Sequence, residues 1–394
     1  MHSMSANKFY GRPYLQKGDF MYNNSIERLG AMFDCVPVKD RADIPIYPQL
    51  ITWAGRYAGK TQKEIFADHR VYFNCVKKVF DDFGYPDAMN PADPATIVFG
   101  EGLPANYPGK QLGDDELFQF VETINIEEDD YKKIVEKGWD KWFMDYTCRI
   151  QNPPMSKFQV IKTFINMGKK GAELVKTFRP LGVEPISGST FFPLFDQLSL
   201  IRSFGEFIMD LYDEPDMIKQ ILDKETPIII KTQLKRNKKN PIKRMHVYAM
   251  RSDASVISPD IFDEFSYPYL KQMILAFHEA GFKTVLHADG KWLPMLDRFL
   301  ELPKGSVHFE FDGNTDLRQA AQILDGHLSF RGDVPATMMA MGTPDEVSEY
   351  CEGLIEDVGM KTPGFMLGTG CEVPLNCKPE NYKALMDSIL KARK

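Results

Sequence analysis

Hydrophobic and polar positions alternate in blocks through the second half of the chain. Short apolar runs at 245–250, 284–286, 307–311, 328–330 and 365–367 are typical of buried strands. Between them, apolar residues recur at helical spacing, which predicts helices over 259–280, 292–300, 316–324, 344–358 and 379–394. Strands that alternate with helices in this way predict βαβ units and a parallel sheet.

The first half of the chain has a less regular pattern. It predicts strands at 44–51 and 183–187 and helices at 63–83, 127–147, 155–178, 200–213 and 215–234. A single (β/α)8 barrel accommodates a chain of this length as one domain. We therefore expect an N-terminal extension over 1–43 and a barrel over 44–394. The charged helices of 115–180 are expected to form an insertion that caps the barrel mouth.

Composition narrows the class of protein. The chain has 394 residues and a net charge of −7, whereas nucleic-acid-binding proteins usually carry a basic surplus. It has no apolar run long enough for a transmembrane helix, and its start lacks the apolar segment of a secretory signal. The six cysteines are scattered without a CxxC pair, which favours reduced thiols in a cytoplasmic protein.

Polar side chains follow the predicted strands, where a barrel places its chemistry. They are Asp253, His287, Asp289, Glu310, Asp333 and Cys371. His287 and Asp289 are two positions apart at a strand end, so their side chains point the same way. Imidazole, thiolate and carboxylate are all zinc ligands. A histidine paired with a carboxylate and a small buried cysteine would explain the same residues without a metal.

Other candidate positions carry weaker signals. Arg56 follows the first predicted strand and would suit an anionic group, or would pair with a surface carboxylate. Asp93 closes a turn-rich segment over 85–93, where a capped, solvated turn is the alternative. The glycines Gly368 and Gly370 lack the rest of a dinucleotide fingerprint. Seven basic residues over 231–244 are typical of a solvated helix end, with a docking patch as the alternative.

Several segments resemble the uroporphyrinogen decarboxylase superfamily, which also contains cobalamin-dependent methyltransferases. They are I-S-G-S-T-F at 186–191, D-L-Y-D-E-P at 210–215, S-D-A at 252–254, I-S-P-D-I-F-D-E-F at 257–265, P-Y-L-K at 268–271, H-A-D-G at 287–290, R-G-D-V at 331–334, G-T-P-D-E-V at 342–347 and G-C-E-V-P at 370–374. The resemblance covers 183–394 well and 45–100 loosely. It implies a single (β/α)8 barrel, in agreement with the alternation of strands and helices.

The resemblance also implies a metal site. In the corrinoid methyltransferases, H-x-C and a late cysteine hold zinc, which activates a thiol. Here His287 and Cys371 match, and Asp289 replaces the first cysteine. We expect His287, Glu310 and Cys371 as zinc ligands, with Asp289 as a fourth ligand or as a residue that orients the others. A carboxylate leaves zinc harder and more Lewis-acidic than a thiolate does, which suits an oxygen substrate.

By this resemblance the chain is expected to be a zinc-dependent methyltransferase. It would move a methyl group from a small O-methyl substrate, such as a methoxylated aromatic, to the cob(I)alamin of a partner corrinoid protein. The chain lacks a D-x-H-x-x-G corrinoid motif of its own, so the partner supplies the cobalamin. The sequence leaves the oligomeric state open, a homodimer included. Expected pocket residues are Phe191, Tyr248, Asp253, Asp333, Arg56 and Asp93.

Three alternatives stay open. A thiol-methylating relative would transfer the methyl group of methylcobalamin to a bound thiolate. A decarboxylase like the family's namesake would need several cations for its substrate; the segment 54–57 keeps A-G-R-Y, but Thr52 stands where the first arginine would be. The third alternative is a non-enzymatic barrel that binds a corrinoid or another tetrapyrrole.

Overall fold

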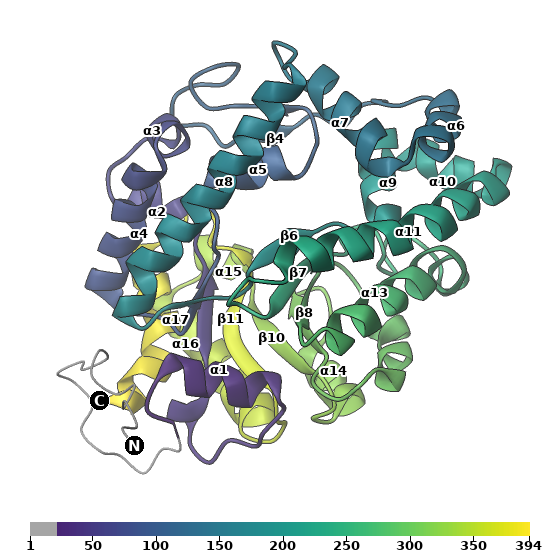
Figure 1. The fold of residues 1–394 in the computed structure, drawn as a ribbon. Helices are drawn as coiled ribbons and strands as arrows, with labels where there is room; N and C mark the ends of the chain where they lie inside the picture. Colours follow the sequence, from purple (N-terminus) through teal and green to yellow (C-terminus); the bar gives the residue numbers. More distant parts are fainter. Residues whose placement is uncertain (1–21) are drawn as a thin grey trace, which may run out of the picture.

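The computed structural model describes residues 22–394, and its centre is a ring of parallel strands (Figure 1). Seven of them form one sheet in the order β1-β11-β10-β9-β8-β7-β6, and the neighbouring β2 and β5 pair with each other. Their bounds are β1 (Ile46–Gln49), β2 (Ala88–Met89), β5 (Glu184–Pro185), β6 (Ser189–Phe191), β7 (Arg244–Tyr248), β8 (Lys283–Ala288), β9 (Val307–Phe311), β10 (Ser329–Val334) and β11 (Phe365–Glu372).

Backbone hydrogen bonds close this ring into a (β/α)8 barrel. Asp87 N donates to Ile46 O at 2.9 Å, which joins β2 to β1, and Gly188 N donates to Arg244 O at 2.9 Å. The strands β5 and β6 follow each other in one extended segment and count as one interrupted strand. The predicted barrel is therefore confirmed, but the two-residue strand β2 was missed, because 85–93 reads as a turn.

The strands read as apolar runs because both of their faces are covered. Every residue of β9 is buried, and so is every residue of β10. β11 is longer than the predicted 365–367 and extends through Cys371 to Glu372. Its G-T-G-C-E end has little apolar character, so the hydrophobic pattern ends before the strand does.

The helices surround the ring. Those that follow or precede barrel strands are α2 (Trp53–Tyr57), α3 (Gln62–Ala67), α4 (His69–Phe83), α8 (Lys157–Phe178), α11 (Pro215–Asn237), α12 (Pro259–Ile261), α13 (Tyr267–Glu279), η4 (Leu293–Glu301), α14 (Leu317–Leu324), α15 (Ala336–Met341), α16 (Pro344–Leu354) and α17 (Pro379–Leu390). Short turns of other helix types are η1 (Arg41–Asp43), η2 (Arg179–Leu181), η3 (Phe262–Ser266), η5 (Ile355–Gly359) and η6 (Lys391–Arg393).

Three predicted helices are broken in two, each at a residue with a non-helical backbone. The helix expected over 63–83 breaks at Asp68, which caps α4 with its side chain. The helix expected over 127–147 breaks at Gly138 (φ 82°), and the one expected over 200–213 breaks at Ser203 (φ 75°). The helix expected over 292–300 is η4, which has 3-10 geometry. Apolar spacing alone does not register such local breaks.

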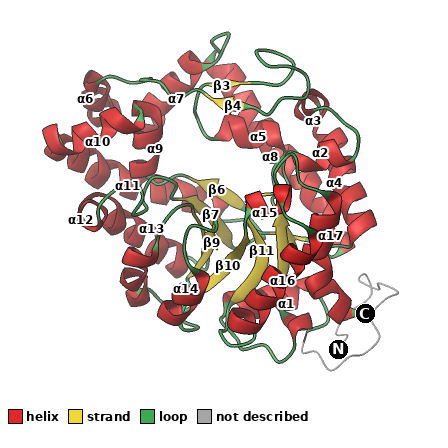
Figure 2. Cartoon of the chain, turned by 180° about the vertical axis from the view of Figure 1, so that it is seen from behind, coloured by secondary structure: helices red, strands yellow, loops and turns green. Residues whose placement is uncertain are grey.

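An arc of helices lies over one end of the barrel (Figures 1 and 2). It contains α5 (Pro94–Gly100), α6 (Glu128–Lys137), α7 (Trp139–Ile150), α9 (Leu194–Arg202), α10 (Phe204–Asp213) and the hairpin of β3 (Ala105–Asn106) and β4 (Gln119–Phe120). The arc lies over the carboxyl end of the strands. Leu117, in the hairpin between β3 and β4, lines the same depression as Cys371, which is near the carboxyl end of β11. The last turn of α8 packs on α4, where the rings of Phe178 and Phe80 are 5.7 Å apart.

The opposite end of the barrel is closed by α1 (Ser25–Phe33). Leu29, Met32 and Phe33 of this helix join a small core cluster with inward-facing strand residues such as Val285 and Met366. Residues 1–21 of the expected N-terminal extension lie outside the described residues. Among residues 22–394, none of the helices combines the length and the apolar character that crossing a membrane requires.

Candidate metal centre

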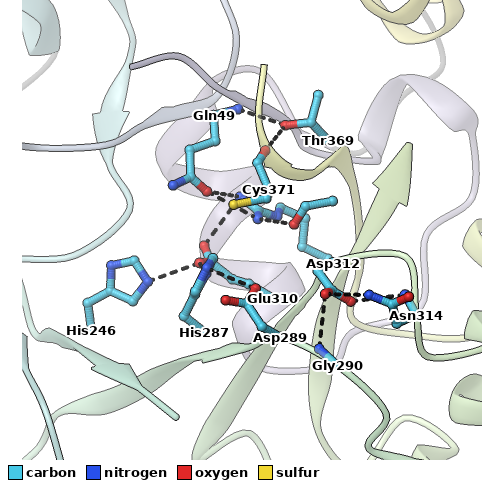
Figure 3. A network of polar contacts seen from close by, with 12 residues as sticks. Gln49, His246, His287, Asp289, Gly290, Glu310, Asp312, Asn314, Thr369 and Cys371 are labelled. Carbon is cyan, nitrogen blue, oxygen red and sulfur yellow. Dashed lines mark hydrogen bonds and ion pairs between the residues drawn. The ribbon is translucent and has the colours of Figure 1, made fainter. Parts of the chain in front are cut away.

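Inward-facing side chains of β7, β8 and β9 meet at a buried carboxylate. The strand register places His287 beside Glu310. His287 Nδ1 lies 3.0 Å from Glu310 Oε2, and His246 Nε2 lies 2.9 Å from the same oxygen (Figure 3). All three side chains are buried, and Arg331 Nη1 approaches the other oxygen, Glu310 Oε1, at 3.5 Å. Glu310 therefore contacts two imidazoles with Oε2 and faces the guanidinium of Arg331 with Oε1.

A second group of donors lies on the opposite side of the His287 ring. Its Nε2 is 3.3 Å from Asp289 Oδ1, and Cys371 is within hydrogen-bonding reach of the same ring. One ligand atom from each of these three residues lies within 4.8 Å of the other two. The sequence expectation that positions 287, 289 and 371 converge agrees with this geometry.

The charges of the cluster are strongly coupled. Burial alone would lower the pKa of His287, but the acidic groups around it raise this pKa well above its usual value. Burial alone would raise the pKa of Glu310, but Arg331 and His246 hold it well below its usual range. The pKa of Asp289 is also lowered, because the charge of His287 outweighs the cost of burial. The cluster is thus built to surround a positive charge.

The donors present fit a zinc ion. Glu310 Oε1 and Asp289 Oδ1 are buried oxygens that accept no well-aligned hydrogen bond within residues 22–394. An imidazole nitrogen, a carboxylate and a thiolate are donors of the kind that zinc takes, and catalytic zinc sites use three protein ligands. A ligating histidine usually donates its other ring N–H to a carboxylate, and Glu310 occupies that position behind His287.

The turn after β8 is held from two sides. Asp253 Oδ1 accepts a hydrogen bond from Lys291 N at 2.9 Å, and Asp312 Oδ2 accepts one from Gly290 N at 2.9 Å. Gly290 has a φ of +88°, and a Cβ there would lie 2.2 Å from Asp253 Oδ1. Asp253 was expected in the substrate pocket; it clamps the turn that carries Asp289 instead.

The other expected pocket residues separate into two groups. Phe191 and Tyr248 line a large cavity beside the cluster, and the rings of Tyr248 and His287 are 5.1 Å apart. Asp333 does not point into that cavity but accepts a hydrogen bond from Tyr350 Oη at 2.7 Å.

Two further expected residues are committed to structural contacts. Asp93 caps α5 through Thr96 and forms an ion pair with Lys170 at 3.2 Å. Arg56 pairs with Asp115 at 3.0 Å, on the wall of a shallow depression that it shares with Cys371. The turn cap expected as the alternative for Asp93 is present, but the side chain is buried rather than solvated, and the expected pairing of Arg56 with a surface carboxylate is confirmed.

Three residues near the cluster were missed. His246 lies within the apolar run of β7, where its alternation with Tyr248 on the same face was the available signal. Arg331 is fully buried in β10. Glu101, just past α5, lines the large cavity and lies near His287 and Asp289; burial raises its pKa to about 7. No motif marks Glu101, because only the folding of the arc over the barrel brings it to the site.

The protein is thus of the (β/α)8-barrel class, with a buried polar cluster at the carboxyl ends of its strands. Residues 184–392 match the family described as uroporphyrinogen decarboxylase (URO-D), and the chain belongs to that family. The uroporphyrinogen decarboxylase of Chlorobaculum parvum is 24% identical over 182 residues, which are 45% of this chain and 50% of that protein. The chain therefore spans about half the length of the curated relative it matches.

A solved structure covers nearly the whole chain. A methyltransferase from Methanosarcina mazei superposes with a TM-score of 0.66 and 15% sequence identity, over 94% of this chain and 98% of that one. This likeness concerns the fold, and it extends from the barrel to the arc of helices.

Proposed function

We propose that this protein is a zinc-dependent methyltransferase that moves a methyl group from an O-methyl substrate to the cob(I)alamin of a partner corrinoid protein. The observation that carries the proposal is the convergence of His287 Nε2, Asp289 and Cys371 at the carboxyl ends of β8 and β11. Its setting, a barrel mouth beside a large cavity, is where enzymes with this fold place their chemistry.

The decarboxylase alternative has less support in the site. A porphyrinogen with eight carboxylates calls for several free cations at the mouth. Arg56, the residue matched to that role, is paired with Asp115, and Asp93 caps a helix and pairs with Lys170. Neither residue is left to bind such a substrate.

We assign the zinc to His287 Nε2, Asp289 and Cys371, and we assign a supporting role to Glu310. The expectation that Glu310 is itself a ligand is harder to reconcile with its two imidazole contacts on one oxygen. By accepting the Nδ1–H of His287, Glu310 fixes the tautomer that leaves Nε2 free to ligate. Bound there, zinc would supply Lewis acidity toward the leaving oxygen.

Other residues of the chain would position the carboxylate of Asp289 and exclude water from the site. The turn held by Asp253 and Asp312 fixes the backbone beside Asp289, so that its carboxylate needs little reorganisation. The aromatic wall formed by Tyr248 and Phe192, whose rings stack 5.0 Å apart, keeps water from the methyl group. The cob(I)alamin of the partner would supply the electron pair for the new bond to the methyl carbon, and the carbon–oxygen bond would break with its own pair left on the substrate oxygen.

Asp289 favours an oxygen substrate over a thiol. In the thiol-methylating relatives that the sequence resembles, a second thiolate occupies this position. A carboxylate donates less charge, which keeps the metal harder and better matched to an alkoxide or phenolate. The same replacement argues against the thiol alternative.

The test measures zinc and turnover together. We expect about one zinc per chain in the purified protein, as in a three-ligand catalytic site, and consumption of cob(I)alamin when a methoxylated aromatic is added, followed by cobalt absorbance. Cys371→Ala should lose most of the zinc and the activity. Cys148→Ala is the matched control, because Cys148 is a half-buried thiol on α7 outside the cluster. Full zinc content in Cys371→Ala would overturn the assignment.

A further inference from the structure

The helices α8 and α11 flank strand β6 but stand apart from each other (Figure 1). Between them Thr190 of β6 is exposed, and its register opposite His246 places it on the same side of the sheet as that inward-facing residue. The space between them is a cavity of about 1280 Å³, lined by both helices, by α7 and by residues 187–192. Pockets for small ligands usually measure about 300–1,000 Å³, so this cavity exceeds what one methoxylated ring would need.

The cavity runs along the barrel from its mouth toward its opposite end. Tyr248 and Ile242 both line it, and they are six residues apart along β7 and the loop before it. At about 3.3 Å per extended residue, this separation corresponds to about 20 Å. The upper end reaches the candidate metal centre, because Tyr248 lies against His287 there.

The middle of the cavity is apolar. On α8, Ile161, Phe164 and Ile165 line it and stay 46%, 42% and 54% exposed. Phe143 and Met144 of α7 line it as well. A contiguous apolar face that no other part of the described chain covers marks a binding surface.

Charge is distributed unevenly between the two ends. Arg236 and Lys239 line the lower end, and within residues 22–394 neither forms an ion pair. Of the carboxylates in the lining, Glu101 lies at the upper end near His287. The other lining carboxylate, Asp140, lies near Glu225 of α11, because the backbone N–H of the preceding residue Trp139 donates to Glu225 at 2.8 Å.

Glu225 lies eleven residues before Arg236 on α11, which places it about 16 Å away along the helix. The acidic groups and the unpaired cations therefore occupy different parts of the cavity. The neutral polar groups beside the cations are already engaged: Asn240 Nδ2 donates to Gly188 O at 2.7 Å, and Asn237 Nδ2 donates to Ser189 Oγ at 3.2 Å.

We propose that this cavity binds an elongated amphipathic small molecule with an anionic end. Its anionic group would lie on Arg236 and Lys239, its apolar body on α8, and its methoxy end beside Tyr248 and His287. The identity of the methoxy end rests on the proposed methyltransferase function; the binding of the apolar body and of the anion does not. The substrate would thus be longer than a single methoxylated ring.

A glycine offers a way to block the cavity without damage to the fold. Gly168 lies on α8 and lines the cavity, and a Cβ built there meets nothing within 4 Å. Gly168→Leu should fill the space and raise helix propensity by about 1 kcal/mol. Gly205→Leu is the matched control, since Gly205 is a helical glycine on α10 with equally open surroundings and does not line the cavity.

The probes are the fluorescent amphiphile dansylaminoundecanoate and its uncharged methyl ester. We expect the wild type to bind the acid more tightly, and Gly168→Leu to weaken both probes about tenfold or more, with a melting temperature no lower than that of the wild type. Arg236→Gln combined with Lys239→Gln should weaken the acid about tenfold and leave the ester unchanged. Lys235→Gln with Lys238→Gln, which changes cations outside the lining, should leave both unchanged.

The proposal is overturned if Gly168→Leu binds both probes as the wild type does, or if acid and ester bind equally in every variant. It is also overturned if sedimentation shows a wild-type dimer that Gly168→Leu converts to monomer, because a second copy would then cover the cavity. Zinc content and methyl transfer are measured on the same samples. A protein without zinc that still binds the acid through Arg236 and Lys239 would refute the methyltransferase and keep the cavity proposal.

Discussion

Glu310→Gln separates a residue that supports the metal from a residue that ligates it. The carboxylate oxygen Oε2 accepts from His246 and His287 at 2.9 and 3.0 Å, in a fully buried setting. An amide oxygen in the place of Oε2 could still accept from both imidazoles, but it carries no charge and holds them more weakly, and the amide NH2 would face Arg331. If Glu310 orients His287 from behind, zinc affinity should fall about 10–100-fold, the usual cost of losing such a partner. This loss corresponds to about 1.4–2.7 kcal/mol.

The same substitution has a cost in stability. Arg331 is fully buried, and Glu310 lies 3.5 Å from it. An uncompensated buried charge costs about 3–5 kcal/mol. Arg331 also donates to Gln49 Oε1 at 3.3 Å, so we expect the variant to fold with a lower free energy of unfolding. Adding Arg331→Met should restore much of this stability and leave zinc affinity low.

The assay is a competition titration of zinc against a chelator, with urea unfolding of the metal-free protein measured in parallel. Asp333→Asn is the control, because Asp333 is a buried carboxyl on the neighbouring strand that contacts Tyr350. Zinc affinity in Glu310→Gln equal to that of the wild type would refute the supporting role. Loss of zinc as complete as in Cys371→Ala would show instead that Glu310 is a direct ligand.

Two further predictions concern the frame of the barrel. Asp87 is buried between Arg28 and Arg393, at 2.8 and 2.9 Å, so Asp87→Asn should lower the free energy of unfolding by about 3–5 kcal/mol at neutral pH. Burial would raise the pKa of Asp87, but the two arginines hold it below its usual value; its contribution is therefore complete above about pH 4 and declines on acidification. Urea midpoints at about pH 7 and pH 3 check this, and a gap between wild type and variant that widens in acid would contradict it. Gly332→Ala should cost about 1–3 kcal/mol, because the added Cβ would lie 1.8 Å from Leu317 Cδ1; an unchanged melting temperature would contradict it.

The repeating part of the fold is visible in the sequence because each strand there has its own hydrophobic run. Val307–Phe311 is a strand with the bounds that its pattern predicts. The strand β2 is different, because it spans two residues and is fixed by distant partners. Asp87 N bonds to Ile46 O, and its carboxylate reaches Arg28 and Arg393. Contacts between residues so far apart in the chain leave no local pattern.

The candidate metal centre likewise contains some residues that the sequence marks and others that it does not. His287, Asp289 and Cys371 could be found because each follows or ends a strand, and strand ends meet at one face of a barrel. Their partner His246 could be found only by treating a polar residue inside an apolar strand as inward-facing. Glu101 reaches the site on a segment outside the barrel, so its position depends on tertiary packing alone.

The replacement of a cysteine by Asp289 and the size of the cavity point in the same direction. In the proposed zinc site, a carboxylate would make the metal a better activator of oxygen, but a harder metal would also bind water more readily. Selective transfer then depends on excluding water and on placing the methyl group accurately, and both improve when a substrate is anchored far from the reacting atom. A cavity of about 1280 Å³ with an apolar wall and unpaired cations at the far end offers such an anchor. The donor set of the proposed zinc site and the shape of the cavity would therefore both suit a large, anionic methyl ether.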